Sequence, residues 1–189
     1  FRGSTGRGEE FVNAGDGEWG RKMQTDKSDG LKALADAGIV DAERACIVGA
    51  SYGGYAAVAG VTIEQDVYRC AVAVNGVFDL KRWLDWRITG RKDIFRRSAD
   101  RQFGRDTDLE AISPTKLAER ADAPVLLIHG DVDDVVPFEE LKIAGEALQN
   151  AEFEVYSHVQ EGTGHGIAPD GLSVALAFMH EKLGLERQG

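Results

Sequence analysis

The chain of 189 residues contains only two cysteines and four prolines, and it has no long apolar run. Two cysteines cannot form the disulfide framework of a small secreted domain. Cys46 and Cys70 each open an apolar segment, which predicts free cysteines that act as small buried hydrophobic residues. A membrane helix needs about 20 successive apolar residues, and neither such a segment nor a signal peptide is found. We therefore expect a soluble chain with no membrane partner.

An excess of basic charge is also absent. The sequence has 22 Lys and Arg against 32 Asp and Glu, which gives a net charge of -10, and no basic cluster stands clear of neighbouring acids. Nucleic acid and anionic membranes are poor partners for such a surface.

The cysteines say little about compartment, and we favour the cytoplasm over the periplasm. With 43% apolar residues, residues 1–189 are long enough for one domain and short for two.

Apolar strand-like segments alternate with helical ones. Four strands are expected, at "ACIVGA", "CAVAVNGV", "APVLLIHGD" and "EFEVYSHV". The first two are continuously apolar, as parallel strands covered on two faces tend to be. Helices are expected at residues 17–38, 52–62, 137–149 and 170–184, and residues 79–121 are the least regular part. In the first helix, Leu31, Leu34, Ala35 and Ile39 are spaced to share one face. This alternation predicts a parallel α/β sheet.

The segment "CIVGASYGGYAA" runs from a strand into a small-residue helix through a serine between glycines. Gly49 and Gly53 stand two residues to either side of Ser51, where side chains would clash in a sharp turn. This G-x-S-x-G pattern is typical of a strained turn that exposes a nucleophilic serine. The backbone N–H of Tyr52, at the start of the helix, would then point at a developing oxyanion. The alternative is a glycine-rich turn with an idle serine.

A serine hydroxyl needs a base to take its proton, and the base needs a carboxylate that orients it. Asp131, Asp133 and Asp134 follow one predicted strand, and His165 lies in a glycine-flanked loop after the next. The order serine, acid, histidine is that of α/β hydrolases. Three further histidines compete for the role of base. We expect His129 to brace the acid loop, His158 to lie within a strand and His180 on the last helix.

Two other kinds of site have weak support. The carboxylates of "DVDD" lack the glycine and glutamate of a calcium-binding EF-hand loop. The glycines of "GSTGRG" are not followed by the lysine of a phosphate-binding loop. We therefore expect no metal and no cofactor, because acyl transfer through a serine needs only side chains and water.

The segments "FRGSTGRG", "GASYGGYAA", "VLLIHGDVDDVVPFEE" and "GTGHG" occur in an order that resembles the catalytic domain of the prolyl oligopeptidase family of serine peptidases. The likeness is strongest to acylaminoacyl-peptidase and dipeptidyl-peptidase members and runs along nearly the whole chain. The resemblance implies an α/β-hydrolase fold, with helices on both faces of a parallel sheet. It also implies Ser51 as nucleophile, Asp133 as acid, His165 as base and the N–H of Tyr52 as oxyanion donor.

The resemblance further implies a pocket for the residue before the scissile bond, formed by Val77, Trp83 and Val136, with Trp86 as a further candidate. The alternative is that the two tryptophans pack the irregular segment against the core. The first strands of the family's sheet and the second oxyanion donor would lie before Phe1. We therefore expect one partial catalytic domain with an apolar edge beside the nucleophile strand, which pairs with a missing N-terminal segment or with a second copy.

Three functional hypotheses follow. The first is a serine peptidase that cleaves oligopeptides or aminoacyl-peptides through an acyl-enzyme. The second keeps the same triad but acts on esters or thioesters, because an activated serine serves any acyl transfer. The third is a noncatalytic fragment that acts by association through its exposed edge.

Overall fold

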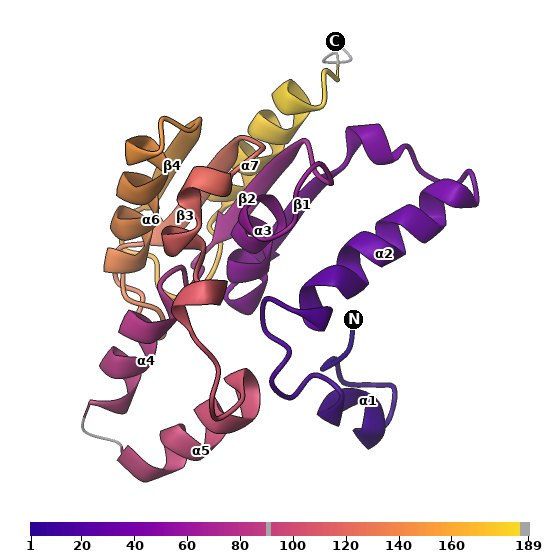
Figure 1. Ribbon diagram of the computed structural model, residues 1–189. Coiled ribbons are helices and arrows are strands. Elements are labelled where there is room, and N and C mark those ends of the chain that lie inside the picture. Colours follow the sequence, from indigo (N-terminus) through magenta and orange to yellow (C-terminus); the bar gives the residue numbers. More distant parts are fainter. Residues whose placement is uncertain (90–91, 186–189) are drawn as a thin grey trace.

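A computed structural model describes residues 1–89 and 92–185 (Figure 1). Its centre is a parallel sheet in the order β1-β2-β3-β4, formed by β1 (Cys46–Ala50), β2 (Cys70–Val74), β3 (Val125–Gly130) and β4 (Val155–Gln160). Strands β1, β2 and β3 fall within the segments expected to form them, and β4 extends one residue beyond its segment, to Gln160. The carboxyl ends of parallel strands lie at the same edge of a sheet, so the loops after β1, β3 and β4 come together there.

Helices connect the strands and precede and follow them along the chain. They are α1 (Glu9–Asn13), α2 (Lys22–Asp36), α3 (Tyr52–Thr62), α4 (Leu80–Ile88), α5 (Lys92–Phe103), α6 (Glu139–Asn150) and α7 (Pro169–Lys182). Short 3₁₀ helices occur at Ala42–Arg44, Glu110–Ile112, Pro114–Lys116 and Ala118–Arg120. Within the described ranges, no helix has both the length and the hydropathy needed to cross a bilayer.

The segment 79–121 is more regular than its sequence indicated. It contains α4 and α5 in addition to 3₁₀ turns. The carboxylate of Asp79 accepts the N–H of Arg82 at 3.0 Å and so caps the start of α4. The segment that we expected to be irregular thus contains two helices. The charged composition gave no helical pattern, but Asp79 caps the start of α4.

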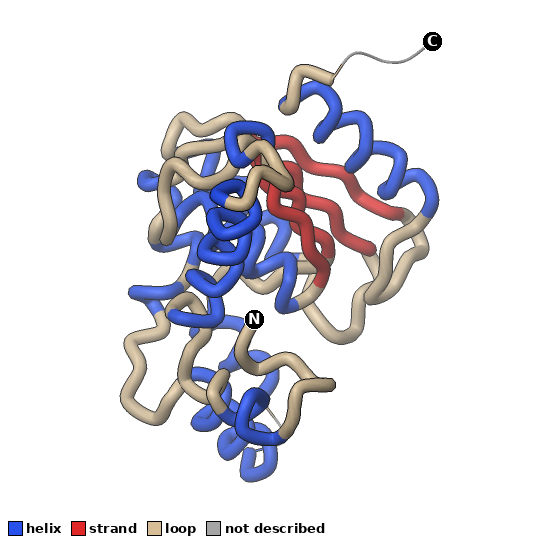
Figure 2. The backbone as a smooth tube through the Cα atoms, turned by 90° about the vertical axis from the view of Figure 1, so that its right-hand side faces the viewer, coloured by secondary structure: helices blue, strands red, loops and turns tan. Residues whose placement is uncertain are grey.

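Helices cover both faces of the sheet, as expected (Figures 1 and 2). Alternate residues of a strand point to opposite faces. On one face, strand residues pack against α3 and α6; they are Ile47, Ala71, Ala73, Val125 and Leu127. On the other face, strand residues pack against Ala175 and Phe178 of α7; they are Val72, Val74, Leu126 and Ile128.

Strand β1 is an edge of the described sheet, with β2 as its one partner. Its residue Val48 is 50% exposed. Helix α2 ends at Asp36, so Leu34 lies within it and Ile39, expected on the same face, lies beyond its end. The two side chains are 44% and 69% exposed. Helix α2 instead buries Met23 and Gln24, in its first turn.

The two cysteines form a disulfide, which corrects the expectation that they are free. Cys46 opens β1, Cys70 opens β2, and the two residues are direct partners in the parallel register. Their pairing follows from strand order, which places two residues 24 positions apart side by side.

Candidate active site

The turn between β1 and α3 holds Ser51 in a strained conformation. Its φ is 57° and its ψ is -118°, which non-glycine residues rarely adopt. The N–H of Ser51 donates to the carbonyl of Val74 at 2.9 Å, which ties the turn to the end of β2. A Cβ on Gly49 would lie 2.5 Å from the backbone of Gly53, whereas a Cβ on Gly53 would meet nothing within 4 Å. The predicted clash is therefore confirmed at Gly49 and wrong at Gly53.

An acid and a histidine meet in the loops after β3 and β4. Nδ1 of His165 lies 2.7 Å from Oδ2 of Asp133. The other oxygen of Asp133, Oδ1, accepts the N–H groups of Val135 and Val136 at 2.8 and 2.9 Å. The Asp133 side chain is fully buried, while that of His165 is 24% exposed. The carboxylate is thus fixed on both sides, and the imidazole keeps one edge open to solvent.

Strand order brings the loop of Ser51 to the same sheet edge as this pair. Among the described residues, neither the hydroxyl of Ser51 nor Nε2 of His165 forms a hydrogen bond. Within the described residues, the structure thus bonds His165 to Asp133 and shows no hydrogen bond between His165 and Ser51.

His129 braces the acid loop, as the sequence predicted. It is completely buried, and its Nε2 donates to the carbonyl of Val136 at 3.0 Å. Nε2 also lies 3.5 Å from Oδ2 of Asp133. Burial lowers the pKa of His129, an effect that the bond to Val136 and the charge of Asp133 only partly offset. A neutral His129 therefore lies behind the carboxylate and adds no positive charge to it.

The remaining candidates have other contacts. Oδ1 of Asp131 accepts the N–H of Gly162 at 2.7 Å and so joins the acid loop to the histidine loop. His158 lies within β4, and its Nε2 is 2.9 Å from Oδ2 of Asp170 on α7. Within the part of the chain that the structure describes, no three His, Cys, Asp or Glu side chains are grouped as a metal site would need.

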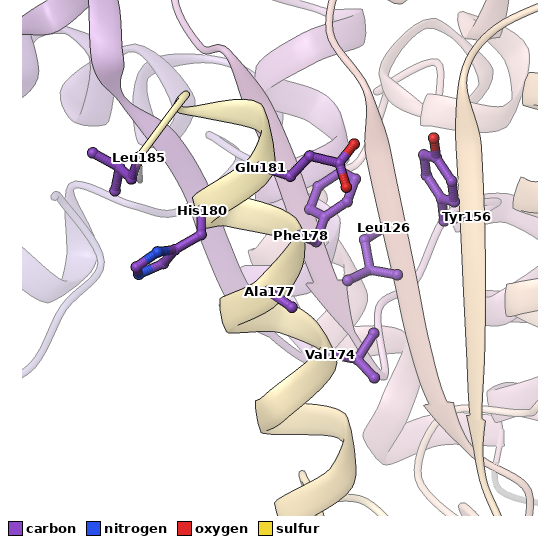
Figure 3. A pocket seen from close by; sticks show the side chains of 8 residues that line it. All are labelled: Leu126, Tyr156, Val174, Ala177, Phe178, His180, Glu181 and Leu185. Carbon is purple, nitrogen blue, oxygen red and sulfur yellow. The ribbon is translucent and has the colours of Figure 1, made fainter. Parts of the chain in front are cut away.

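His180 lines a different site, a cavity of about 480 Å³ between α7 and the sheet (Figure 3). Leu126 of β3 and Tyr156 of β4 face Phe178 and Glu181 of α7 across it. The residues that line this cavity do not include Ser51, Asp133 or His165.

Tyr52 follows the candidate nucleophile as the first residue of α3. The first N–H groups of a helix have no partner within the helix, so the N–H of Tyr52 is suited to bind an anion. The Tyr52 ring packs edge-on against Trp19, with centroids 4.5 Å apart. Nζ of Lys27 donates to its hydroxyl at 3.3 Å. Burial lowers the pKa of Lys27 to about 8 and raises that of Tyr52.

The three residues expected to bind substrate lie together in one buried cluster. Val77, Trp83 and Val136 are 2%, 7% and 1% exposed, and they pack with Tyr55 and Phe103. Nε1 of Trp83 is buried without a hydrogen-bond partner among the described residues. Trp86 is 46% exposed and lies outside this cluster.

Two amide side chains that the sequence analysis did not single out contact the histidine loop. Asn75 and Gln160 both donate to the carbonyl of Gly166, at 2.8 and 3.1 Å. Both side chains belong to residues that are 1% exposed. The signal in the sequence is an amide at the end of an apolar strand, at "VAVNG" and "YSHVQ".

Comparisons with known proteins bear on the family and the fold of this chain. A profile of the prolyl oligopeptidase family matches residues 1–185. Dipeptidyl aminopeptidase BIII of Pseudoxanthomonas mexicana is 33% identical over 173 residues, which cover 89% of this chain and 25% of that protein. Acyl-protein thioesterase 1 of Gibberella zeae is 28% identical over 149 residues, covering 78% of this chain and 52% of that protein.

Among solved structures, a puromycin-hydrolyzing peptidase of Mycobacterium tuberculosis superposes with a TM-score of 0.89 at 29% identity. The match covers 99% of this chain and 29% of the peptidase. The chain therefore spans between a quarter and a third of the length of these two peptidases.

Proposed function

Because this chain belongs to the prolyl oligopeptidase family, we propose that it carries the catalytic serine, acid and base of a serine peptidase. In this proposal Ser51 is the nucleophile, His165 is the base and Asp133 orients the base. The observation that carries the assignment is the 2.7 Å contact between Nδ1 of His165 and Oδ2 of Asp133. It leaves Nε2 as the basic nitrogen of the imidazole.

The reaction proceeds through an acyl-enzyme. Oγ of Ser51 attacks the scissile carbonyl while Nε2 of His165 takes the hydroxyl proton. The C–N bond of the tetrahedral intermediate then breaks, and the imidazolium gives its proton to the leaving amine. Water attacks the resulting ester with the same base, and Ser51 leaves as the free hydroxyl. The Asp133 carboxylate orients the imidazole and stabilises the imidazolium that forms.

The N–H of Tyr52 binds the oxyanion that forms in both steps. Val77, Trp83 and Val136 form the wall that receives the residue before the scissile bond. The apolar character of these side chains favours an apolar residue of the substrate at that position. The substrate class is oligopeptides or aminoacyl-peptides.

The exposed edge of the sheet supports an association at β1. Val48 is 50% exposed on this strand, and an unpaired strand edge offers backbone hydrogen bonds to another strand. Sedimentation analysis of the chain measures this directly: a strictly monomeric species over a wide concentration range would exclude self-association.

Hydrolysis of esters or thioesters is a second candidate, supported by the similarity to acyl-protein thioesterase 1. The same serine, histidine and acid would serve, since only the leaving group differs. A blocked aminoacyl ester and the matching anilide separate the two functions. Ester turnover with no detectable anilide turnover would favour the second candidate.

The deciding experiment is labelling with a fluorophosphonate probe followed by intact mass measurement, on the protein that contains this chain. We expect one adduct in the unaltered protein and none in the Ser51→Ala variant. Peptide-anilide hydrolysis is measured in parallel. Hydrolysis that persists in Ser51→Ala would refute the assignment.

A further inference from the structure

Asn75 connects the two loops that carry the acid and the histidine. It directly follows β2, is 1% exposed and has a φ of 48°. Its Oδ1 accepts the N–H of Gly130, the last residue of β3, at 3.0 Å. Its Nδ2 donates to the carbonyl of Gly166, the residue after His165, at 2.8 Å. One side chain thus bonds the backbone on both sides of the catalytic pair.

Gln160 completes the attachment of the histidine loop. It is the last residue of β4, and its Nε2 donates to the same Gly166 carbonyl at 3.1 Å. Its Oε1 accepts the N–H of Ala168 at 2.6 Å, just before α7. A Cβ on Gly171 of α7 would collide with this Oε1. The glycine therefore gives the Gln160 amide the space that it needs beside the helix. Both ends of the segment after His165 are therefore held by one buried side chain.

The histidine loop needs such support because of its composition. Residues 161–168 include Gly162, Gly164 and Gly166, and glycine loses more conformational entropy on ordering than any other residue. The Gly166 carbonyl has two lone pairs, and the two amides occupy both.

We propose that Asn75, assisted by Gln160, is a positioning residue. It holds the backbone of His165 at the position from which the imidazole bonds Asp133. The expected effect on catalysis rests on the proposed function. The structural claim concerns only the bond between His165 and Asp133. A displacement of about 1 Å in a catalytic group costs on the order of 100-fold in rate. Loss of Asn75 should therefore lower kcat rather than affinity.

The test compares Asn75→Gly with Glu152→Gly. Glycine accepts the positive φ of Asn75, so the first variant removes only the side chain and its two bonds. Glu152 also has a positive φ, 58°, and lies in the turn after α6, so it is the matched backbone control. In the protein that contains this chain, we expect Asn75→Gly to lower kcat by about 10- to 100-fold with KM within about threefold. We expect Glu152→Gly to leave both constants within about twofold.

The second readout does not depend on turnover. In a Ser51→Ala background, the low-field proton spectrum reports the Nδ1 proton of His165 through its exchange rate with water. We expect Asn75→Gly to raise that rate by at least about tenfold, because the imidazole no longer stays against Asp133. This measurement tests whether Asn75 positions His165, and its result does not depend on whether Ser51 is the nucleophile.

A third variant covers the case in which Asn75→Gly does not fold. Asn75→Asp keeps the acceptor for the Gly130 N–H and replaces the donor to Gly166 with a second acceptor, so the same losses are expected. A folded Asn75 variant with unchanged kcat and an unchanged proton exchange rate would overturn the proposal. A loss of stability without those two changes would assign Asn75 a structural role alone.

Discussion

Asp133 and His165 are 32 positions apart in the sequence, yet Oδ2 of the first lies 2.7 Å from Nδ1 of the second. The contact depends on neighbouring strands that end at one edge of the sheet, with β3 leading to the acid and β4 to the histidine. The two loops also bond each other directly, since the N–H of Val132 donates to the carbonyl of Thr163 at 3.2 Å. Backbone hydrogen bonding between the two loops therefore helps to hold the two side chains in contact.

Asp133→Asn tests the role of this pair. Asparagine keeps the size and one acceptor for the N–H groups of Val135 and Val136, but its amide cannot hold His165 in the tautomer with a basic Nε2. We expect kcat for a peptide anilide to fall by roughly 10⁴-fold with the fold intact.

The control for that experiment is Asp134→Asn, at the exposed neighbour that the sequence alone could not exclude. We expect this variant to retain turnover within about threefold, as surface substitutions usually do. If Asp134→Asn proved the more damaging of the two, the acid would have been misassigned.

The disulfide between Cys46 and Cys70 is expected to stabilise the fold. Closing a loop of this size restricts the unfolded chain, and such a bond contributes about 3 kcal/mol to the free energy of unfolding. Urea unfolding with and without a thiol reductant measures the difference. In a Cys46→Ala/Cys70→Ala double variant the reductant should have no effect, and titration of two free thiols in the unreduced protein would contradict the pairing.

His129 should make stability depend on pH. Burial lowers its pKa below the ordinary value of 6.5, so the unfolded chain binds this proton more readily than the folded one. The stabilisation from neutral His129 is complete above about pH 6.5 and is lost as pH falls from there toward the folded-state pKa. The contribution of this one group cannot exceed about 1.4 kcal/mol per pH unit.

The measurement is urea unfolding at pH 7.5 and 5.5 of the unaltered protein and of His129→Gln. Glutamine retains an N–H donor for the carbonyl of Val136 but does not titrate. We expect the free energy of unfolding to fall more steeply with acid in the unaltered protein. Equal slopes would mean that His129 has the same pKa in both states.

The sequence predicted those features that depend on local pattern. The apolar runs located β1, β2 and β3, and the small-residue run predicted α3 at its observed bounds. The turn at Ser51 was recognisable because Gly49 must accommodate the backbone of Gly53, a constraint that acts within five residues.

Features that depend on tertiary contacts were not predictable in the same way. Periodicity placed Leu34 and Ile39 on one apolar face but could not tell that Leu34, in α2, and Ile39, beyond its end, would remain exposed. The pairing of Cys46 with Cys70 depends on the register of β1 against β2. The role of Asn75 depends on contacts with residues 55 and 91 positions away, which no local pattern encodes.

The two glycines around Ser51 offer a last test, because the structure assigns them unequal roles. A Cβ on Gly49 would lie 2.5 Å from backbone atoms of Gly53, which cannot move without displacing the start of α3. We expect Gly49→Ala to lower the free energy of unfolding by about 1–3 kcal/mol, as overpacking does. Gly53→Ala places its methyl group in open space within a helix, where alanine is favoured over glycine by up to about 1 kcal/mol.

Thermal unfolding of both variants tests these unequal roles. A lower Tm for Gly49→Ala and an equal or higher Tm for Gly53→Ala fit the structure. Equal destabilisation by both would mean that the motif needs two glycines for a reason other than the close approach of β1 to α3.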